Sequence, residues 1–235
     1  MFVMLAALFL TAGIAVAYEL KSRGRQQTIS SEAAGWALHR AGTMLRQPWV
    51  VIVLTTTFFE GMFFFGAFTF VGSYLWARFE LGFDLVGLIV AGFGVGGLIY
   101  SASAAQLVRR LGETGLAAGG GILIAVSFVA ITAAPTPLAV APATILAGFG
   151  YYMIHNTLQT NATQMASRVR GLAVGTFARC LFLGQSIGSH SRHRCSTTPE
   201  APLYSSLPAV FSSYLASPFV YVLSGFHDPN CCTAI

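Results

Sequence analysis

Two charged residues lie within long apolar stretches of this sequence, and both could take part in proton chemistry. Glu60 lies eleven residues beyond Trp49, or about 16 Å along a helix, and Arg179 lies about 12 Å into a later apolar stretch. A charge at the centre of a bilayer costs roughly 2.5–3.5 kcal/mol, and it therefore usually serves a function. Because loss of water favours the neutral form of a carboxyl, Glu60 is a candidate proton carrier.

Each of these charges has an alternative interpretation. The Glu60 carboxyl could be a structural group that is bonded to a nearby hydroxyl, on Thr56 or Thr57. Arg179 could pair with Glu60, which would lower the cost of both charges. Its long side chain could instead extend toward the membrane surface.

A polar group interrupts another apolar stretch, near the end that we expect to be cytoplasmic. It contains Tyr152, His155 and Asn156. Histidine can change its charge near neutral pH, so these residues are further candidates for a substrate or proton pathway. A histidine that is only hydrogen-bonded at the membrane interface is the alternative.

No enzyme class is indicated by the motifs of this sequence. It contains no Gly-x-Ser-x-Gly, no His-Glu-x-x-His and no phosphate-binding loop. The four cysteines include no Cys-x-x-Cys pair, so no metal, redox centre or cofactor is predicted. The thirteen Lys and Arg residues lie mostly in connections rather than on one face, which argues against nucleic-acid binding.

The composition indicates the class of protein in which these residues lie. Of 235 residues, 55% are apolar and only 9% are charged, and the mean hydropathy is +0.69. A soluble domain carries about 25% charged residues. We therefore expect an integral membrane protein whose surface is covered by the lipid bilayer.

Six apolar stretches are close to the length of about 20 residues that a membrane helix needs. The predicted fold is an all-α polytopic bundle, and a cleaved signal peptide is an alternative for the first stretch, which contains Ala15-Val16-Ala17. The predicted organisation is a first helix at 1–18, a cytoplasmic linker at 19–48, a five-helix bundle at 49–189 and an atypical tail at 190–235. The six predicted spans are 1–18, 49–77, 85–107, 115–134, 138–158 and 171–189.

The basic residues predict the orientation of these spans. Loops 19–47, 108–114 and 159–170 contain nine Lys and Arg residues, whereas loops 78–84 and 134–137 contain only Arg78. Because cytoplasmic loops collect basic residues, the first group of loops is expected in the cytoplasm.

The composition changes beyond Ser189. Only one of the 25 glycines but five of the nine prolines lie there. Our hypothesis is that 190–235 is not native to the fold, as a shifted reading frame would produce. A seventh span at 203–226 is the alternative.

Small residues recur at a spacing of four on the predicted helices. The pairs Gly92 and Gly96, and Gly171 and Gly175, let helix backbones approach closely in a membrane. We expect tight helix packing at these pairs, with a sliding contact as the alternative.

Several segments resemble the major facilitator superfamily, and most closely the C-terminal half of bacterial efflux-type members. The likeness covers about residues 1–189, after which the chain looks truncated or frame-shifted. In the loop that resembles the family's Gly-x-x-x-Asp-Arg-x-Gly motif, Arg110 and Gly112 match, while Arg109 replaces the carboxylate. The segments that carry the likeness are Phe58-Phe59-Glu60-Gly61-Met62, the run from Gly66 to Gly72, the run from Leu158 to Gln164, and Arg170-Gly171.

The resemblance implies half of a two-bundle transporter that exports a small organic molecule in exchange for protons. It implies residence in a bacterial inner membrane and a substrate cavity shared with an N-terminal six-helix half. The alternative is a non-transporting membrane subunit, or an inert remnant, that packs against a partner half.

Overall fold

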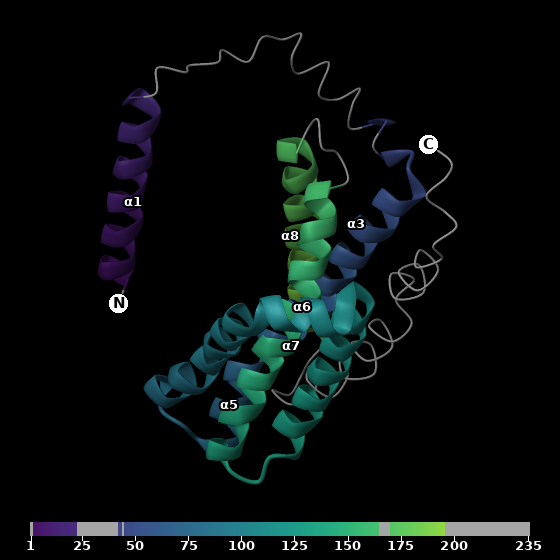
Figure 1. Ribbon diagram of the computed structural model, residues 1–235. Helices are drawn as coiled ribbons and strands as arrows, with labels where there is room; N and C mark the ends of the chain where they lie inside the picture. Colours follow the sequence, from purple (N-terminus) through teal and green to yellow (C-terminus); the bar gives the residue numbers. More distant parts are fainter. Residues whose placement is uncertain (1, 23–41, 44, 165–169, 196–235) are drawn as a thin grey trace. The chain divides into compact units, whose positions relative to one another are not determined.

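The computed structural model describes residues 2–22, 42–43, 45–164 and 170–195 (Figure 1). The chain divides into two compact units, residues 1–40 and 41–235. Most of the predicted linker 19–48, the tail beyond residue 195 and the alternative seventh span at 203–226 lie outside the described residues.

The first unit contains one helix, α1 (Phe2–Ser22). Its apolar side chains are exposed, among them Phe9 and Leu10, each 67% accessible, and Ile14. A helix that is apolar on all sides suits a lipid environment. This helix covers the first predicted span.

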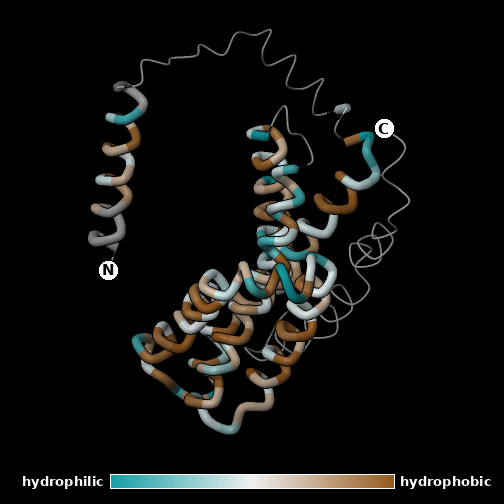
Figure 2. The backbone as a smooth tube through the Cα atoms, viewed as in Figure 1, coloured by the Kyte–Doolittle hydropathy of each residue, from teal (hydrophilic) through white to brown (hydrophobic). Residues whose placement is uncertain are grey.

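The second unit is built from helices alone in its described part. Three of its helical stretches are long and apolar enough to cross a membrane: residues 48–79, α6 and α7 (Figure 2). The predicted fold class, an all-α membrane helix bundle, is confirmed. The elements are α3 (Pro48–Glu60), η1 (Gly61–Phe65), α4 (Gly66–Phe68), α5 (Val71–Phe79), α6 (Phe83–Ala133), α7 (Pro137–Gln164) and α8 (Arg170–Cys195).

The stretch from α3 to α5 contains one π-helical turn. Pro48 begins α3, where a proline needs no hydrogen-bond partner for its nitrogen. Directly after Glu60 the chain forms one π-helical turn, η1, and it then returns to α-helix. Such turns inside α-helices are frequent at functional sites.

Helix α6 consists of two arms that meet at one glycine. Gly112 has φ 64° and ψ −179°, a conformation that favours glycine, and it separates a first arm, 83–111, from a second arm, 113–133. The sequence predicted two spans joined by loop 108–114. The structure reduces this loop to a sharp change of helix direction (Figure 1).

Glycines set the spacing between α6 and α7. A Cβ atom at Gly96 would overlap the carbonyl oxygen of Ile145, and one at Gly148 would overlap that of Phe93. A Cβ atom at Gly92 would lie 2.7 Å from the Thr144 hydroxyl. The two backbones are therefore in direct contact, as membrane helices with small residues allow.

A second close contact joins α8 to α3 and η1. Here Gly184 faces the carbonyl oxygen of Phe58, and Gly188 faces that of Met62. In contrast, a Cβ atom at Gly171 or Gly175 would meet no atom within 4 Å. In the described part of α8, the close approach at Gly184 and Gly188 therefore lies about four to five turns beyond Gly171.

Candidate functional site

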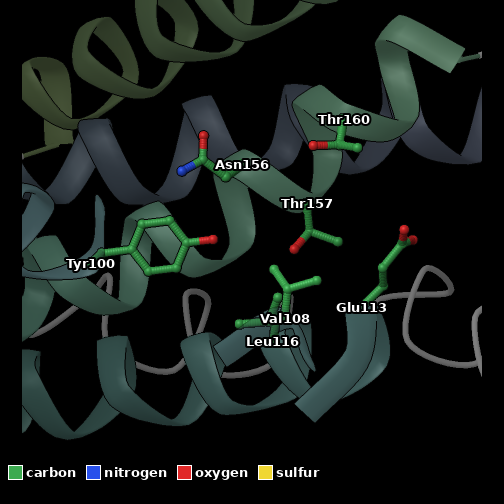
Figure 3. A pocket seen from close by; sticks show the side chains of 7 residues that line it. All are labelled: Tyr100, Val108, Glu113, Leu116, Asn156, Thr157 and Thr160. Atoms are coloured by element: carbon green, nitrogen blue, oxygen red, sulfur yellow. The ribbon is translucent and has the colours of Figure 1, made fainter. Parts of the chain in front are cut away.

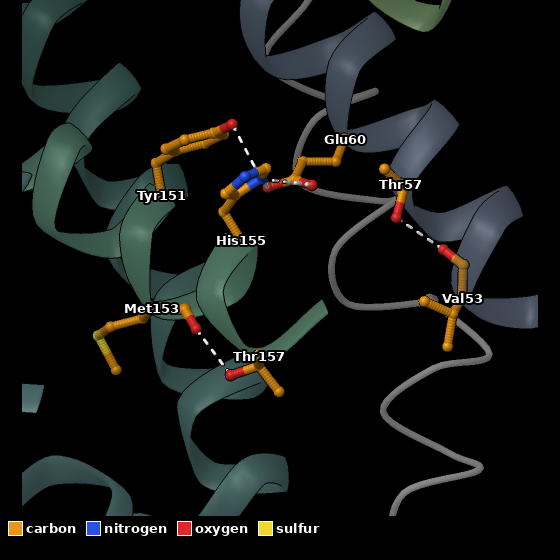
Figure 4. A network of polar contacts seen from close by, with 7 residues as sticks. All are labelled: Val53, Thr57, Glu60, Tyr151, Met153, His155 and Thr157. Atoms are coloured by element: carbon orange, nitrogen blue, oxygen red, sulfur yellow. Dashed lines mark hydrogen bonds and ion pairs between the residues drawn. The ribbon is translucent and has the colours of Figure 1, made fainter. Parts of the chain in front are cut away.

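Glu60 lies where α3 passes into the π-helical turn, and it is almost completely buried, with 2% of its surface accessible. Its carboxylate faces His155 of α7 (Figure 4). The Nδ1 atom of His155 lies 3.3 Å from Oε1 of Glu60 and 3.4 Å from Oε2. The structure thus joins two residues that the sequence analysis named separately as pathway candidates.

Tyr151 contacts the same nitrogen of His155. Its hydroxyl lies 3.1 Å from Nδ1, and the two rings are stacked with centroids 5.1 Å apart (Figure 4). A protonated Nδ1 can donate to the Glu60 carboxylate, whereas an unprotonated Nδ1 can accept from the Tyr151 hydroxyl. The arrangement can therefore accommodate either proton position on the histidine.

Oγ1 of Thr56 is buried without a hydrogen-bond partner within the described structure. Oε1 of Glu60 lies 3.3 Å from Nδ1 of His155 but forms no hydrogen bond with it. The Thr57 hydroxyl donates to the Val53 carbonyl, 2.8 Å away, so it serves its own helix. Among the described residues, His155 rather than a threonine is thus the partner of Glu60. A buried acceptor without a partner is costly, so this place favours a visiting proton or donor.

Aromatic side chains surround the Glu60–His155 pair. Phe64 stacks on Tyr151 with ring centroids 4.6 Å apart, and Phe65 meets the same ring edge-on at 5.3 Å. Phe177 of α8 lies 5.6 Å from the His155 ring. Phe64 and Phe65 belong to η1, and Glu60 directly precedes it. The π-helical turn therefore determines the position of the carboxylate and of part of the apolar wall around it.

The remaining pathway candidates lie elsewhere. Arg179 is exposed on α8 and forms no ion pair with Glu60 in the described part of the chain. Tyr152 packs against Gly97 and lies 5.8 Å from the Phe93 ring. Asn156 lines a small pocket between α6 and α7 (Figure 3).

The predicted loop motif coincides with the break of α6. Arg109 and Arg110 are exposed, and Gly112 provides the turn. Glu113 was not among the residues that the sequence indicated, and its Oε2 accepts a hydrogen bond from Nδ2 of Asn161 at 3.0 Å. A carboxylate therefore does contact a neighbouring helix end here, one turn beyond the place where the family motif has its own.

The fold and the buried pair together define an integral membrane protein with an ionisable centre inside its helix bundle. The sequence profile of the Major Facilitator Superfamily matches residues 1–189. The chain belongs to this superfamily of membrane transporters. No curated protein and no solved structure matches the chain.

Proposed function

We propose that this chain takes part in proton-coupled export of a small organic molecule, with Glu60 as the residue that binds and releases the proton. The observation that carries the proposal is the contact between buried Glu60 and His155, 3.3 Å apart. Ionisable residues inside a membrane commonly mark proton or substrate pathways. Residence in a bacterial inner membrane, as the resemblance implies, would supply the proton gradient.

The proton step that we propose uses only side chains of this site. A protonated Glu60 donates its proton toward Nδ1 of His155, and the transfer leaves a carboxylate beside an imidazolium. The reverse transfer restores the neutral pair. The Tyr151 hydroxyl, 3.1 Å from the same nitrogen, favours the neutral histidine by donating to its Nδ1 lone pair.

The π-helical turn gives this step a means of coupling to movement. A π-helical turn holds one more residue than an α-helical turn. Its conversion to α-helix would turn the preceding residues about the helix axis by about 100°. Because Glu60 directly precedes η1, such a conversion would move its carboxylate relative to α7.

We further propose that a second six-helix bundle completes the substrate cavity. Transporters of this superfamily bind their substrates near the bilayer midplane, between two bundles. The described bundle supplies Glu60 and the aromatic wall on one side only. The second bundle would provide the opposite wall and most of the substrate selectivity.

Transport in membrane vesicles tests the proposal. Export of ethidium and chloramphenicol, one cationic and one neutral probe, would be followed in vesicles that contain the full chain together with an N-terminal six-helix half, with and without a pH gradient. We expect gradient-dependent export that the substitution Glu60→Gln removes. Export that is the same in wild type and Glu60→Gln, or that ignores the gradient, would refute the carrier role.

The exposed carboxyl of Asp84 provides a matched control for this experiment. Asp84→Asn changes the charge of the chain by the same amount as Glu60→Gln but lies in the first turn of α6. It should leave gradient-dependent export unchanged.

A further inference from the structure

Two side chains of α5 attach the far end of the helical stretch 48–79 to α6. The Nη1 atom of Arg78 donates to the carbonyl oxygen of Thr132, 2.6 Å away, and also contacts the Tyr74 hydroxyl. The Tyr74 hydroxyl donates to the same carbonyl oxygen at 3.2 Å. Both side chains of α5 therefore converge on one backbone atom of α6.

The sequence explains why this carbonyl takes its donors from another helix. Thr132 is the residue before the last in α6, and the last four carbonyls of a helix have no partner within it. Pro135 and Pro137 follow directly, and a proline has no N–H group to donate. The carboxyl end of a helix also carries partial negative charge, which a guanidinium stabilises. Arg78 thus caps α6 with a hydrogen-bond donor and with its charge.

The aromatic surroundings hold the Arg78 side chain in this place. Its guanidinium carbon lies 5.5 Å from the centre of the Tyr74 ring and 5.4 Å from that of the Phe79 ring, within the range of a cation–π contact. Tyr74 and its neighbour Leu75 are fully buried. Arg78 is also the one basic residue in the loops that we expect outside the cell. Its contact with the end of α6 gives this exception a structural reason.

The other end of the same helical stretch is held in a different way. Here α3 and η1 meet α8 through Gly61, Gly184 and Gly188, each of which faces backbone atoms. Glycines bring two backbones close together, but they have no side chains that interlock or form directed hydrogen bonds. The two sides of η1 therefore differ: hydrogen bonds to α6 restrain α5, whereas a smooth glycine contact borders α3.

We propose that Arg78 is a positioning residue that fixes α5 to α6, so that conversion of η1 to α-helix moves α3 and with it Glu60. This inference rests on the proposed proton step, because it names the residue that directs the movement toward the Glu60 site. A helix that gains or loses a π-helical turn must rotate on one side of that turn. With α5 fixed, the rotating side is α3, which ends at Glu60. Without Arg78, part of the rotation would be lost in α5.

Distances between pairs of spin labels test this inference. The labels are attached to single cysteines that are introduced into the full chain in lipid nanodiscs, after its four native cysteines have been replaced by alanine. The α5 pair, Trp76 and Leu138, reports on α5 relative to α7, and the α3 pair, Val51 and Gln159, reports on α3 relative to α7. All four positions are exposed. Each pair is measured at acidic and at alkaline pH.

In wild type we expect the change of pH to shift the distance of the α3 pair and to leave that of the α5 pair unchanged. Arg78→Met keeps the length of the side chain but removes its charge and its donors. It should broaden the distance distribution of the α5 pair at least about twofold, because α5 loses its attachment. It should also reduce the pH-dependent shift of the α3 pair. Arg46→Met removes an exposed arginine before α3 and should change neither pair.

Two milder variants separate a positioning role from a general loss of structure. Tyr74→Phe keeps the buried ring and removes only the hydroxyl that donates to Thr132, so it should broaden the α5 pair less than Arg78→Met does. Arg78→Lys restores a charge and a donor at the end of α6, and it should recover part of the pH-dependent shift of the α3 pair.

Three results would overturn the inference. The first is that Arg78→Met and Tyr74→Phe both leave the two pairs and their pH dependence as in wild type. The second is that the α5 pair of wild type shifts with pH as much as the α3 pair. The third is that neither pair of wild type shifts with pH.

Infrared detection of the protonated Glu60 carboxyl distinguishes failure of this inference from failure of the proposed function. If Glu60 is seen to exchange its proton while neither pair shifts, the proton step stands and this inference fails. If Glu60 shows no proton exchange, the proposed function fails. Broadening of the α5 pair in Arg78→Met would then still support Arg78 as the attachment of α5 to α6.

Discussion

Two carboxylates of this molecule contact the same helix, α7, six residues apart along it. Glu60 is 2% accessible and meets His155, whereas Glu113 is exposed and meets Asn161. The first partner can take up a proton, and the second cannot. The comparison shows how the surroundings of a carboxyl group limit its chemistry: a buried carboxyl beside a titratable partner suits proton exchange, whereas an exposed one beside an amide forms a hydrogen bond between helices.

The geometry of the helices maintains this difference. At Glu60 the π-helical turn and the contact between α3 and α8 exclude water. At Glu113 the chain turns at Gly112, and the side chain begins a new helical arm at the surface. Changes that alter one of these features should affect one carboxylate and spare the other.

The largest effect on stability is expected when a side chain is introduced where α8 touches α3. A Cβ atom at Gly184 would overlap the Phe58 carbonyl, whereas one at Gly175 of the same helix would meet no atom within 4 Å. Gly184→Ala should lower the free energy of unfolding by about 3 kcal/mol through forced separation of the helices. Gly175→Ala should leave stability nearly unchanged.

Thermal unfolding in detergent measures both variants. Gly184→Ala should also reduce export, while the contact between Glu113 and Asn161 persists. Equal unfolding temperatures for the two alanine variants would show that the α3–α8 contact is not close.

The next largest effect should follow loss of the buried partner. His155→Leu leaves the Glu60 carboxyl without its hydrogen-bond partner and should cost about 2 kcal/mol. The double substitution Glu60→Leu with His155→Leu should recover most of this loss, because no unpaired polar group remains. Chemical unfolding in detergent measures these two variants and Glu60→Leu alone, and additive losses would contradict the pairing.

Removal of the tyrosine hydroxyl should have a smaller effect. Tyr151→Phe keeps the stacked ring but loses the contact with Nδ1 of His155, 3.1 Å away. We expect a loss of about 1 kcal/mol. Nitrogen-15 spectra of labelled histidine should show a shift of the His155 proton from Nε2 toward Nδ1. An unchanged His155 signal would show that the Tyr151 hydroxyl does not act on Nδ1 of His155.

The smallest effect is expected at the exposed carboxylate. Glu113→Ala removes the acceptor of the Asn161 bond and should cost about 0.5 kcal/mol, because water can replace a surface partner. Glu113→Gln retains an acceptor and should cost nothing measurable. If Glu113→Ala lowers the free energy of unfolding by more than His155→Leu does, the expected contrast between the two carboxylates is contradicted.

The fold class was predictable from the sequence because lipid imposes a simple rule on it. Apolar stretches of sufficient length can satisfy their backbone groups only as helices in a membrane. Pro48 and Pro137 mark the first residues of α3 and α7, where the pattern predicted spans to begin. The same hydropathy singled out Glu60 as an exception within an apolar stretch.

The contacts of the site were not predictable in the same way. Glu60 and His155 are 95 positions apart, and hydropathy allowed Arg179 as a partner equally well. The π-helical turn begins at Gly61, where the lack of a side chain admits the Leu181 carbonyl of α8, and this contact between distant segments is not visible in the hydropathy pattern. Glu113 was overlooked because the family motif directs attention to Arg109, although a carboxylate directly after Gly112 was visible in the sequence.

The central claim is that Glu60, and not Glu113, is the carboxyl that exchanges protons. Infrared difference spectra of the full chain in lipid, recorded between acidic and alkaline pH, report directly on protonated carboxylic acids. We predict a carbonyl band from a buried carboxylic acid that is lost in Glu60→Gln and retained in Glu113→Gln. A band that persists in Glu60→Gln, or that disappears in Glu113→Gln alone, would contradict the account.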